Sequence, residues 1–440
     1  MPKHSSSPSR REFLRTTGLA LGATPLRAAG TGVALGSLSG CGTNGSAGAD
    51  FPTLADLTRP TGPDDEAWAH VRPYFMLPPD ISYMNNASLG MPPRVVVDAV
   101  SDGYRAISSE PLHGKHDLQE TIVARVKPRL AAMFGTEVDE MSLTRNATEA
   151  LHLQTIGLDL APGDEVVVTT QEHPAGNKPW MYRAAHHGVS VREVFIPSPL
   201  EETADTVRRF AEAIGPRTKA VAFCHVTRGG HRYPVKAICA WAREQGLASL
   251  VDGAQAIGQF RIDLHDLGCD AYSASLHKWV LGPAGTGFLY IRSGARDRFS
   301  SAFEPDRNLE APGYEPGGTA DFPVRAALAT AIDFVEILGA DRIEARCRFL
   351  SDYLKSRLME LPGCAILSGA TPDRSAPGST IFELSGLNAL DAVPRLEELA
   401  GTHIDEHQRD GHDAIRVSTH VYVTKAEIDR LVEGLVAARG

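Results

Sequence analysis

The sequence predicts an α/β fold, in which a mostly parallel sheet is covered by helices and a smaller C-terminal α+β domain follows. Between residues 141 and 292, short runs typical of strands alternate with stretches of helical periodicity. This alternation is typical of parallel strands joined by crossover helices. From residue 322 onward, two long amphipathic helices precede further strands and a terminal helix. With 440 residues, 42% of them hydrophobic, the chain is long enough to bury a full core.

The predicted elements follow one another in a regular order. Strands are expected at MSLT (141–144), EVVVTT (165–170), VREVFI (191–196), KAVAFCHV (219–226), ASLVDG (248–253), AYSAS (271–275) and GTGFLYI (285–291). Helices are expected at residues 148–158, after Pro174, and at residues 202–214, 235–245, 323–339 and 341–361. Because ligands of such sheets bind beyond the carboxyl ends of the strands, the residues after each run are the first candidates for a site.

The first 41 residues are predicted to be an export signal. Residues 9–15 read SRREFLR, and Pro25 and Arg27 interrupt the apolar stretch that follows, so it is too broken for a membrane span. The segment resembles a twin-arginine signal. Residues 38–41 (LSGC) resemble a lipobox, which implies cleavage before Cys41 and acylation of its thiol; a plain disordered tail is the alternative. We expect export to the periplasm or cell envelope, and the sequence leaves lipid anchoring at Cys41 open.

The predicted domain boundaries follow from these patterns. We expect a signal at 1–41, a linker at 42–50, an N-terminal segment packing on the small domain at 51–95, a large cofactor-binding domain at 96–321 and a small domain at 322–440. The chain carries a net charge of −10, of which the basic leader contributes +4 and the remainder −14, so no nucleic acid partner is expected. Membrane contact is expected only through the leader or a lipid on Cys41.

The cysteines do not predict a metal site or a disulfide framework. The chain has six of them, at positions 41, 224, 239, 269, 347 and 364. They form no CxxC pair and have no regular spacing. We therefore expect no metal in the functional site.

Two charged residues follow predicted strands. Lys278 comes just after the run AYSAS, where a partly desolvated lysine could form a Schiff base, although most lysines are solvated surface charges. Asp252 ends the run ASLVDG, where it could pair with a protonated pyridine ring, with Gln255 donating to the ring oxygen. Capping of the next turn is the alternative for Asp252.

Two further strand ends could contact a planar, phosphorylated ligand. Ala147 and Thr148 open a predicted helix, whose free amides and positive dipole end suit a phosphate; capping alone is the alternative for Thr148. His173 follows the run EVVVTT and could lay its imidazole on a cofactor face and help to move protons. A structural role is the alternative for this histidine.

In this order, the motifs resemble the class V aminotransferases among the fold-type I pyridoxal-phosphate (PLP) enzymes, and particularly their isopenicillin N epimerase-like branch. The match covers roughly residues 83–440. Its motifs are YMNNASLG (83–90), RNATEA (145–150), EHPAGNKPW (172–180), HVTRGGHRYPV (225–235), VDGAQAIGQ (251–259), SLHKW (275–279), PGGT (316–319) and RVSTHVYVT (416–424). The resemblance implies a large domain built on a mostly parallel seven-stranded sheet.

The resemblance also implies a role for each site residue. Lys278 would be the Schiff-base lysine, Asp252 would pair with the pyridine nitrogen, Gln255 would meet the ring oxygen and His173 would stack on the ring. The phosphate would be held by Ala147, Thr148, Ser275 and His277. Thr319, after Gly318, would complete the site of a second subunit, which implies a homodimer.

At the substrate end, the resemblance implies that Arg416 binds the α-carboxylate, with Asn86 as a further substrate contact. A surface ion pair is the alternative for Arg416. The loop after residues 225–226 departs from the family, because it is about one residue shorter and Arg228 precedes two glycines. Arg228 either contacts an anion or points to solvent.

The implied chemistry is loss of the α-proton of an amino acid or an amino-acid-derived amine, with Lys278 as the base. Epimerisation, transamination and β-lyase activity on a carbon-sulfur bond remain open. Family members that are cysteine desulfurases need a cysteine on a substrate loop shortly before the carboxylate arginine, and residues 401–415 contain none. Two other classes remain as alternatives: a catalytically inactive envelope binding protein and a lipid-anchored scaffold.

Overall fold

The computed structural model describes residues 51–304, 311–315 and 317–439, and Asp50–Gly440 form one compact unit. The predicted signal and linker at residues 1–50 lie outside the described residues. Within the described ranges, none of the helices combines the length and apolar character that crossing a membrane requires.

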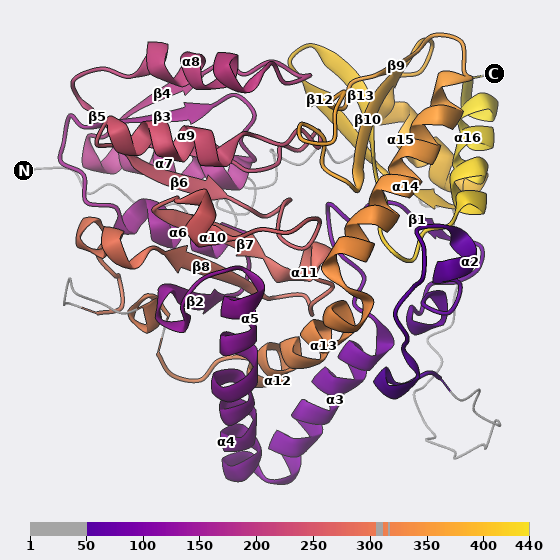
Figure 1. Ribbon diagram of the computed structural model, residues 1–440, viewed down its shortest axis with the longest axis horizontal. Helices are drawn as coiled ribbons and strands as arrows, with labels where there is room; N and C mark the ends of the chain where they lie inside the picture. Colours follow the sequence, from indigo (N-terminus) through magenta and orange to yellow (C-terminus); the bar gives the residue numbers. More distant parts are fainter. Residues whose placement is uncertain (1–50, 305–310, 316, 440) are drawn as a thin grey trace, which may run out of the picture. The chain divides into compact units, whose positions relative to one another are not determined.

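A seven-stranded sheet lies among helices in the left half of the view in Figure 1. Its strands are β2 (Met141–Thr144), β3 (Glu165–Thr169), β4 (Ser190–Val194), β5 (Thr218–Cys224), β6 (Ala248–Asp252), β7 (Ala271–Ser275) and β8 (Gly287–Ile291). They lie in the order β2-β8-β7-β6-β5-β3-β4, and only β8 runs antiparallel to its neighbours. This order confirms the predicted α/β fold with a mostly parallel seven-stranded sheet.

Helices connect the strands of this sheet. They are α6 (Ala147–Gly157), α7 (Pro174–His187), α8 (Thr203–Ala213), α9 (Val235–Glu244), α10 (Leu264–Leu267) and α11 (Leu276–Trp279). Neighbouring strand residues belong to two separate core clusters: Val167 and Val221 pack in one, Val166 and Val168 in the other. Successive side chains of a strand point to opposite faces, so both faces of the sheet are buried. Polar residues are therefore expected mainly beyond the ends of the strands, where the chain leaves the buried faces.

The C-terminal part contains a four-stranded antiparallel sheet in the order β12-β13-β10-β9. Its elements are α12 (Phe322–Ala326), α13 (Leu328–Leu338), α14 (Ala340–Met359), β9 (Cys364–Ile366), β10 (Ser379–Leu384), α15 (Ala389–Ala400), β11 (Thr402–His403), β12 (Asp405–Arg409), β13 (His412–Ser418) and α16 (Lys425–Arg439). The helix predicted at 323–339 is in fact two helices. It divides at Ala327: both helices pack against α3 (Arg94–Ser109), α12 packs also against α4 (Pro111–Thr121), and α13 packs also against α14.

The N-terminal part of the chain, from residue 51 to residue 133, contributes a short strand that pairs with a C-terminal strand. It contains α2 (Asp65–Trp68), β1 (Ser82–Tyr83), α3 (Arg94–Ser109), α4 (Pro111–Thr121), a π-helical turn (Ile122–Val126) and α5 (Lys127–Met133). Short 3-10 turns lie at Leu54–Asp56, Arg72–Tyr74, Val138–Glu140, Ser293–Arg298 and Ala311–Tyr314. Strand β1 pairs in parallel with β11, and Asn85 bridges to Ser418 just beyond it. The domain boundaries expected after residues 95 and 321 stay predictions.

Candidate active site

Most of the predicted site residues line one pocket beyond the carboxyl ends of the parallel strands. Its volume is about 290 Å³, close to the lower end of the usual range for small-molecule sites. The predicted residues that line it are Ala147, Thr148, His173, Asp252, Gln255, Ser275, His277, Lys278 and Arg416. Asn86 and Thr319 are not among its lining residues.

Lys278 lies in α11, directly after β7, and its amine is enclosed by the pocket. Burial lowers the pKa of Lys278 to about 8, although the nearby Asp252 carboxylate opposes this shift. A lysine with this pKa has a much larger neutral, nucleophilic fraction near pH 7 than a solvated lysine has. Gly90 packs against the adjoining backbone, where a Cβ would lie 1.9 Å from the Lys278 carbonyl oxygen, so only glycine fits there.

Asp252 ends β6 with its carboxylate facing the same pocket. The Ala254 N–H donates to Asp252 Oδ1 at 2.9 Å. Burial raises the pKa of Asp252, while the Ala254 hydrogen bond and the Lys278 charge oppose that shift. A buried carboxylate is costly unless a positive partner accompanies it, so this position suits a ligand with a protonated ring nitrogen.

Both polar atoms of the Gln255 side-chain amide form hydrogen bonds. Its Nε2 donates to the Ala87 carbonyl at 2.8 Å, and its Oε1 accepts from Trp279 Nε1 at 3.0 Å. These two contacts fix the orientation of the amide. The second hydrogen of Nε2 remains as a donor at the pocket wall.

The amino end of α6 forms an anion site beside Lys278. Asn146 caps this helix by accepting from the Glu149 N–H at 2.9 Å, and the Ala147 N–H donates to Ser275 Oγ at 2.9 Å. The Ser275 hydroxyl and the Thr148 residue therefore lie together at the positive end of the helix dipole. His277 donates from Nδ1 to the Thr286 carbonyl at 2.9 Å, so its Nε2 carries a proton for an anion only when the ring is protonated.

His173 is the N-cap residue of α7, and its Nδ1 accepts from the Ala175 N–H at 3.1 Å. Burial and the nearby charges of Lys278 and Arg228 lower the pKa of His173 to about 4. The imidazole is therefore neutral near pH 7, which suits stacking on a planar ligand. The same low pKa makes His173 a weak base, which disfavours the predicted role in moving protons.

The chemical groups around the pocket fit the parts of PLP. A buried amine, a buried carboxylate and a helix amino end with a serine hydroxyl match the aldehyde, the ring nitrogen and the phosphate of that cofactor. The residues that sequence reasoning assigned to each of these parts lie around the same cavity. Their individual contacts with PLP stay predictions.

Arg416 lies on β13, directly opposite Asp405 of β12, and only 4% of its side chain is exposed. Its Nη2 forms an ion pair with the Asp405 carboxylate and donates to Asn85 Oδ1 at 3.2 Å. Burial lowers the pKa of Arg416 to about 10, and Asp405 opposes that shift. The guanidinium is therefore a buried cation at the pocket wall with an internal counterion.

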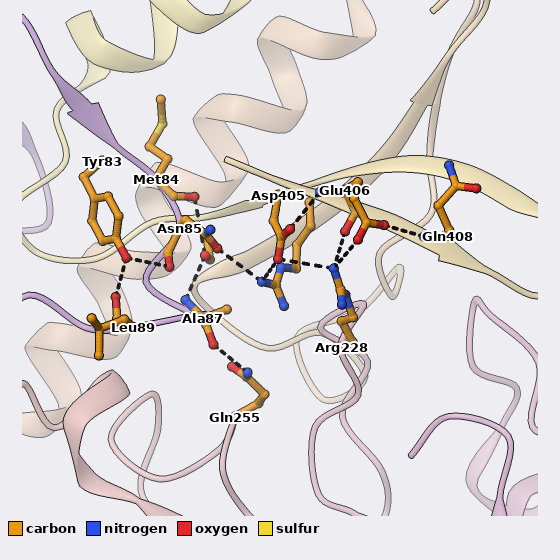
Figure 2. Close-up of polar contacts among 12 residues, drawn as sticks. Tyr83, Met84, Asn85, Ala87, Leu89, Arg228, Gln255, Asp405, Glu406 and Gln408 are labelled. Carbon is orange, nitrogen blue, oxygen red and sulfur yellow. Dashed lines mark hydrogen bonds and ion pairs between the residues drawn. The ribbon is translucent and has the colours of Figure 1, made fainter. Parts of the chain in front are cut away.

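Arg228 reaches the same carboxylate. Its Nη2 lies 3.3 Å from Asp405 Oδ2 and donates to Glu406 Oε1 at 3.0 Å and to the Glu406 carbonyl at 2.7 Å (Figure 2). Sequence reasoning left open whether Arg228 contacts an anion or points to solvent. The structure shows it bound to two carboxylates of the protein itself.

The stretch expected as a substrate loop, residues 401–415, is a β-hairpin in the structure. It is formed by β12 and the start of β13, whereas β11 pairs with β1. The signal that sequence reasoning missed is the pair Asp410-Gly411, both with positive φ, which is typical of a tight hairpin turn. Arg409 donates to the carbonyls of Thr170 and Glu172, at 3.2 and 2.8 Å, so the hairpin is fastened to the segment that carries His173.

Two predicted site residues lie outside the pocket lining. The Asn86 side chain is buried between the Tyr422 hydroxyl, at 2.9 Å, and the Lys278 carbonyl, at 3.4 Å. Its neighbour Asn85 is the asparagine that contacts Arg416, so this placement gives no support to a substrate contact by Asn86. Thr319 lies in an exposed segment, away from the pocket of its own chain.

Cys224 is the one cysteine that lines the pocket within the described part of the chain. It ends β5, fully buried, as predicted for a core strand. Burial raises the pKa of its thiol well above the usual value, and the carboxylates of Glu172 and Asp252 raise it further. Because the thiolate is the nucleophile, this cysteine is poorly suited to attack a substrate.

Comparisons with known proteins agree with this geometry. Residues 82–431 match the family model described as Aminotransferase class-V. The isopenicillin N epimerase of Streptomyces clavuligerus is 30% identical over 394 residues, which cover 85% of this chain and 98% of the relative. A cysteine desulfurase of Haloferax volcanii is 30% identical over 426 residues, covering 89% of this chain and 96% of the relative.

Among solved structures, the protein C-DES is similar at 25% identity. One structure of a C-DES variant has glycine covalently linked to the PLP cofactor; it has a TM-score of 0.73 and covers 81% of this chain and 96% of C-DES. Another is described as the cystine C-S lyase C-DES with its reaction product cysteine persulfide, at a TM-score of 0.72. Together with the family match, these structures support PLP as the cofactor of this protein, and the chain belongs to the class V aminotransferase family of PLP-dependent enzymes.

Proposed function

We propose that the protein acts at the α-carbon of an amino acid or an amino-acid-derived amine, as an epimerase or a transaminase. The observation that carries this proposal is that Lys278, Asp252 and Arg416 line one pocket. A buried amine, a buried carboxylate and a buried guanidinium are the groups that removal of an α-proton requires. The similarity to isopenicillin N epimerase favours epimerisation among the possible outcomes.

Each of these residues has a distinct task in the proposed reaction. Lys278 holds the cofactor and, once released, takes the α-proton on its amine. Asp252 keeps the ring nitrogen protonated, and His173 covers one face of the ring. PLP, when bound, supplies an electron sink for the pair left by the departing proton. Arg416 fixes the α-carboxylate and therefore the orientation of the Cα–H bond.

A β-lyase acting on a carbon-sulfur bond is the second candidate. It is favoured by the similarity to the cystine C-S lyase C-DES. The burial and raised thiol pKa of Cys224 argue against a persulfide on that residue. A lyase of this protein would therefore release its sulfur product without a covalent step on Cys224.

The experiment that separates these reactions follows the α-carbon directly. Purified yellow protein is incubated in deuterated water with single amino acids, and α-deuterium, configuration, oxo acid, pyruvate and sulfide are measured. Deuterium with inversion supports epimerisation, an oxo acid supports transamination, and pyruvate with a sulfur product supports the lyase. A colourless protein that exchanges no α-proton with any amino acid or derived amine contradicts the proposal and leaves the inactive binding protein.

Replacing Arg416 by alanine is expected to weaken substrate use while leaving the visible absorbance of the cofactor intact. Loss of one side of a charge-assisted carboxylate pair costs about 2 to 4 kcal/mol, which corresponds to a fall in kcat/KM of roughly 30- to 1,000-fold. The matched control is R416K, which keeps the charge but not the bidentate geometry and should fall in between. An unchanged kcat/KM for R416A on an α-amino acid would remove Arg416 from carboxylate binding.

We also propose that the enzyme is a homodimer, in which Thr319 of each chain completes the site of the other. The exposed position of Thr319, outside the pocket of its own chain, is compatible with this arrangement. Light scattering of the purified protein measures the assembly directly. A monomer that retains full turnover would contradict this proposal.

The leader carries a separate proposal about location. Replacing Arg10 and Arg11 by lysine is expected to strand active, cofactor-loaded enzyme in the cytoplasm, because the twin-arginine route exports folded proteins and reads the arginine pair. Fractionation of cells with a PLP absorbance assay measures the outcome. Normal envelope localisation of the lysine variant would contradict the export proposal, and a C41S variant tests the lipid anchor independently.

A further inference from the structure

We propose that Asp405 is an internal counterion that a substrate carboxylate displaces from Arg416, and that Arg228 retains Asp405 after this exchange. The inference rests on the proposed function, in which Arg416 binds an α-carboxylate. It assigns the substrate class more narrowly: ligands need an anionic carboxylate at this position, and neutral amides or simple amines are rejected.

The first support is the arrangement of the three charges. Asp405 Oδ2 is shared by Nη2 of Arg416 and Nη2 of Arg228, and all three residues line the same pocket. Figure 2 shows Asp405 between Asn85 on one side and Glu406 and Arg228 on the other. A single carboxylate oxygen therefore already occupies a position between two guanidinium groups, which is the position that suits an incoming carboxylate.

The second support is the unequal burial of the three groups. Only 4% of the Arg416 side chain is exposed, whereas 27% of Asp405 and 25% of Arg228 are exposed. A cation as deeply buried as Arg416 is costly without a counterion, so Asp405 stabilises it when no substrate is present. Asp405 and Arg228 are the members of the cluster with room to move toward solvent.

The third support is unused donor capacity. The Nε atoms of Arg228 and Arg416 are both buried and have no hydrogen-bond partner among the described residues. Each guanidinium therefore has an N–H group that could donate to a further oxygen once the cluster rearranges.

Charge balance then decides which ligands can enter. A bound carboxylate replaces Asp405 as the counterion of Arg416 and leaves Asp405 as a surplus negative charge close by, which is unfavourable in a partly buried site. Arg228, already 3.3 Å from Asp405 Oδ2 and also paired with Glu406, offsets part of that charge. A neutral amide has no charge with which to replace that of Asp405. It therefore does not displace Asp405 from Arg416.

The test is a double-mutant cycle read by ligand binding to the holoenzyme. Propionate and its neutral isostere propionamide are titrated into wild type, D405N, R228Q and the double variant, and the visible cofactor absorbance is followed. We expect D405N to bind propionate about tenfold more tightly and R228Q about tenfold more weakly, because coupled charged neighbours commonly interact by this amount. In the D405N background, the effect of R228Q should shrink to within about threefold. Propionamide should bind poorly throughout.

Matched variants separate the exchange from simpler roles. Glu406 forms an ion pair with Arg228, whereas Asp405 pairs with both arginines, so E406Q should strengthen propionate binding less than D405N does. R228K keeps the charge that retains Asp405 and should stay within about threefold of wild type, which also decides the question if D405N does not fold. If R228K loses as much affinity for propionate as R228Q does, the proposal is overturned.

Other results would overturn the exchange in different ways. Weaker propionate binding by folded D405N would mean that Asp405 only orients Arg416. A loss from R228Q that is equal in both backgrounds would mean that Arg228 contacts the ligand itself. Absence of propionate binding to the wild type, or equal binding of propionamide, also contradicts the exchange. If the protein is yellow and turns over amino acids, such results contradict the exchange of Asp405 alone. If the protein is colourless and inactive, they contradict the proposed function as well.

Discussion

Replacing Lys278 by alanine is expected to abolish the covalent link between the protein and its cofactor and to lower turnover on the order of 10⁴-fold, the upper range for a general base. The reason is that one amine serves both as the attachment point and as the acceptor of the α-proton. Borohydride reduction followed by peptide mapping measures the link. In wild type the adduct should lie on the peptide that contains Lys278, and K278A should give none.

The surroundings of Lys278 add a pH dependence to this expectation. Its folded pKa is about 8, below the ordinary lysine value, so its neutral fraction rises about tenfold per pH unit up to pH 8 and then levels off. Labelling of cofactor-free protein by a small acylating reagent should follow that curve at Lys278. Lys178 and Lys236 are suitable controls, because both are exposed. Lys236 also pairs with Asp266 at the surface. A borohydride adduct on either control lysine would contradict the assignment of Lys278.

Replacing Asp252 by asparagine is the second substitution with a large expected effect. The variant keeps the shape of the side chain and the acceptor for the Ala254 N–H, so PLP should still bind. It removes the charge that keeps the ring nitrogen protonated, and turnover should fall by about 10²-fold or more. Absorbance and kcat measured on the same sample separate binding from turnover. A variant with unchanged kcat would exclude Asp252 from this role.

The strand pattern could be predicted from the sequence because buried parallel strands produce short, strongly apolar runs. The runs ending in Asp252 and Ser275 became β6 and β7 almost without shift. The helix predicted across residue 327 was wrong as one element, because helical periodicity does not reveal the break between α12 and α13, whose neighbours differ only in part. Residues 401–415 were taken as a loop, although the pair Asp410-Gly411 is typical of a tight hairpin turn.

The cofactor end of the site could be predicted better than the substrate end. Lys278, Asp252 and Thr148 each follow a recognisable strand, and the order of strands in the sheet brings them together. Asp405 could not be found in this way, because its role depends on cross-strand register with Arg416. The choice between Asn85 and Asn86 has the same origin: adjacent residues of an extended segment face opposite ways, and only the pairing partner decides which one contacts Arg416.

The contact between Asn85 and Arg416 joins positions 331 residues apart, and therefore fixes when the site can be completed during synthesis. A ribosome releases the first of these residues long before the second. Strand β6, which carries Asp252, and helix α11, which carries Lys278, are made earlier than β13, so the cofactor end can form while Arg416 is still missing. If Arg416 binds the substrate carboxylate as proposed, a nascent chain at that stage can hold PLP but cannot yet select a substrate.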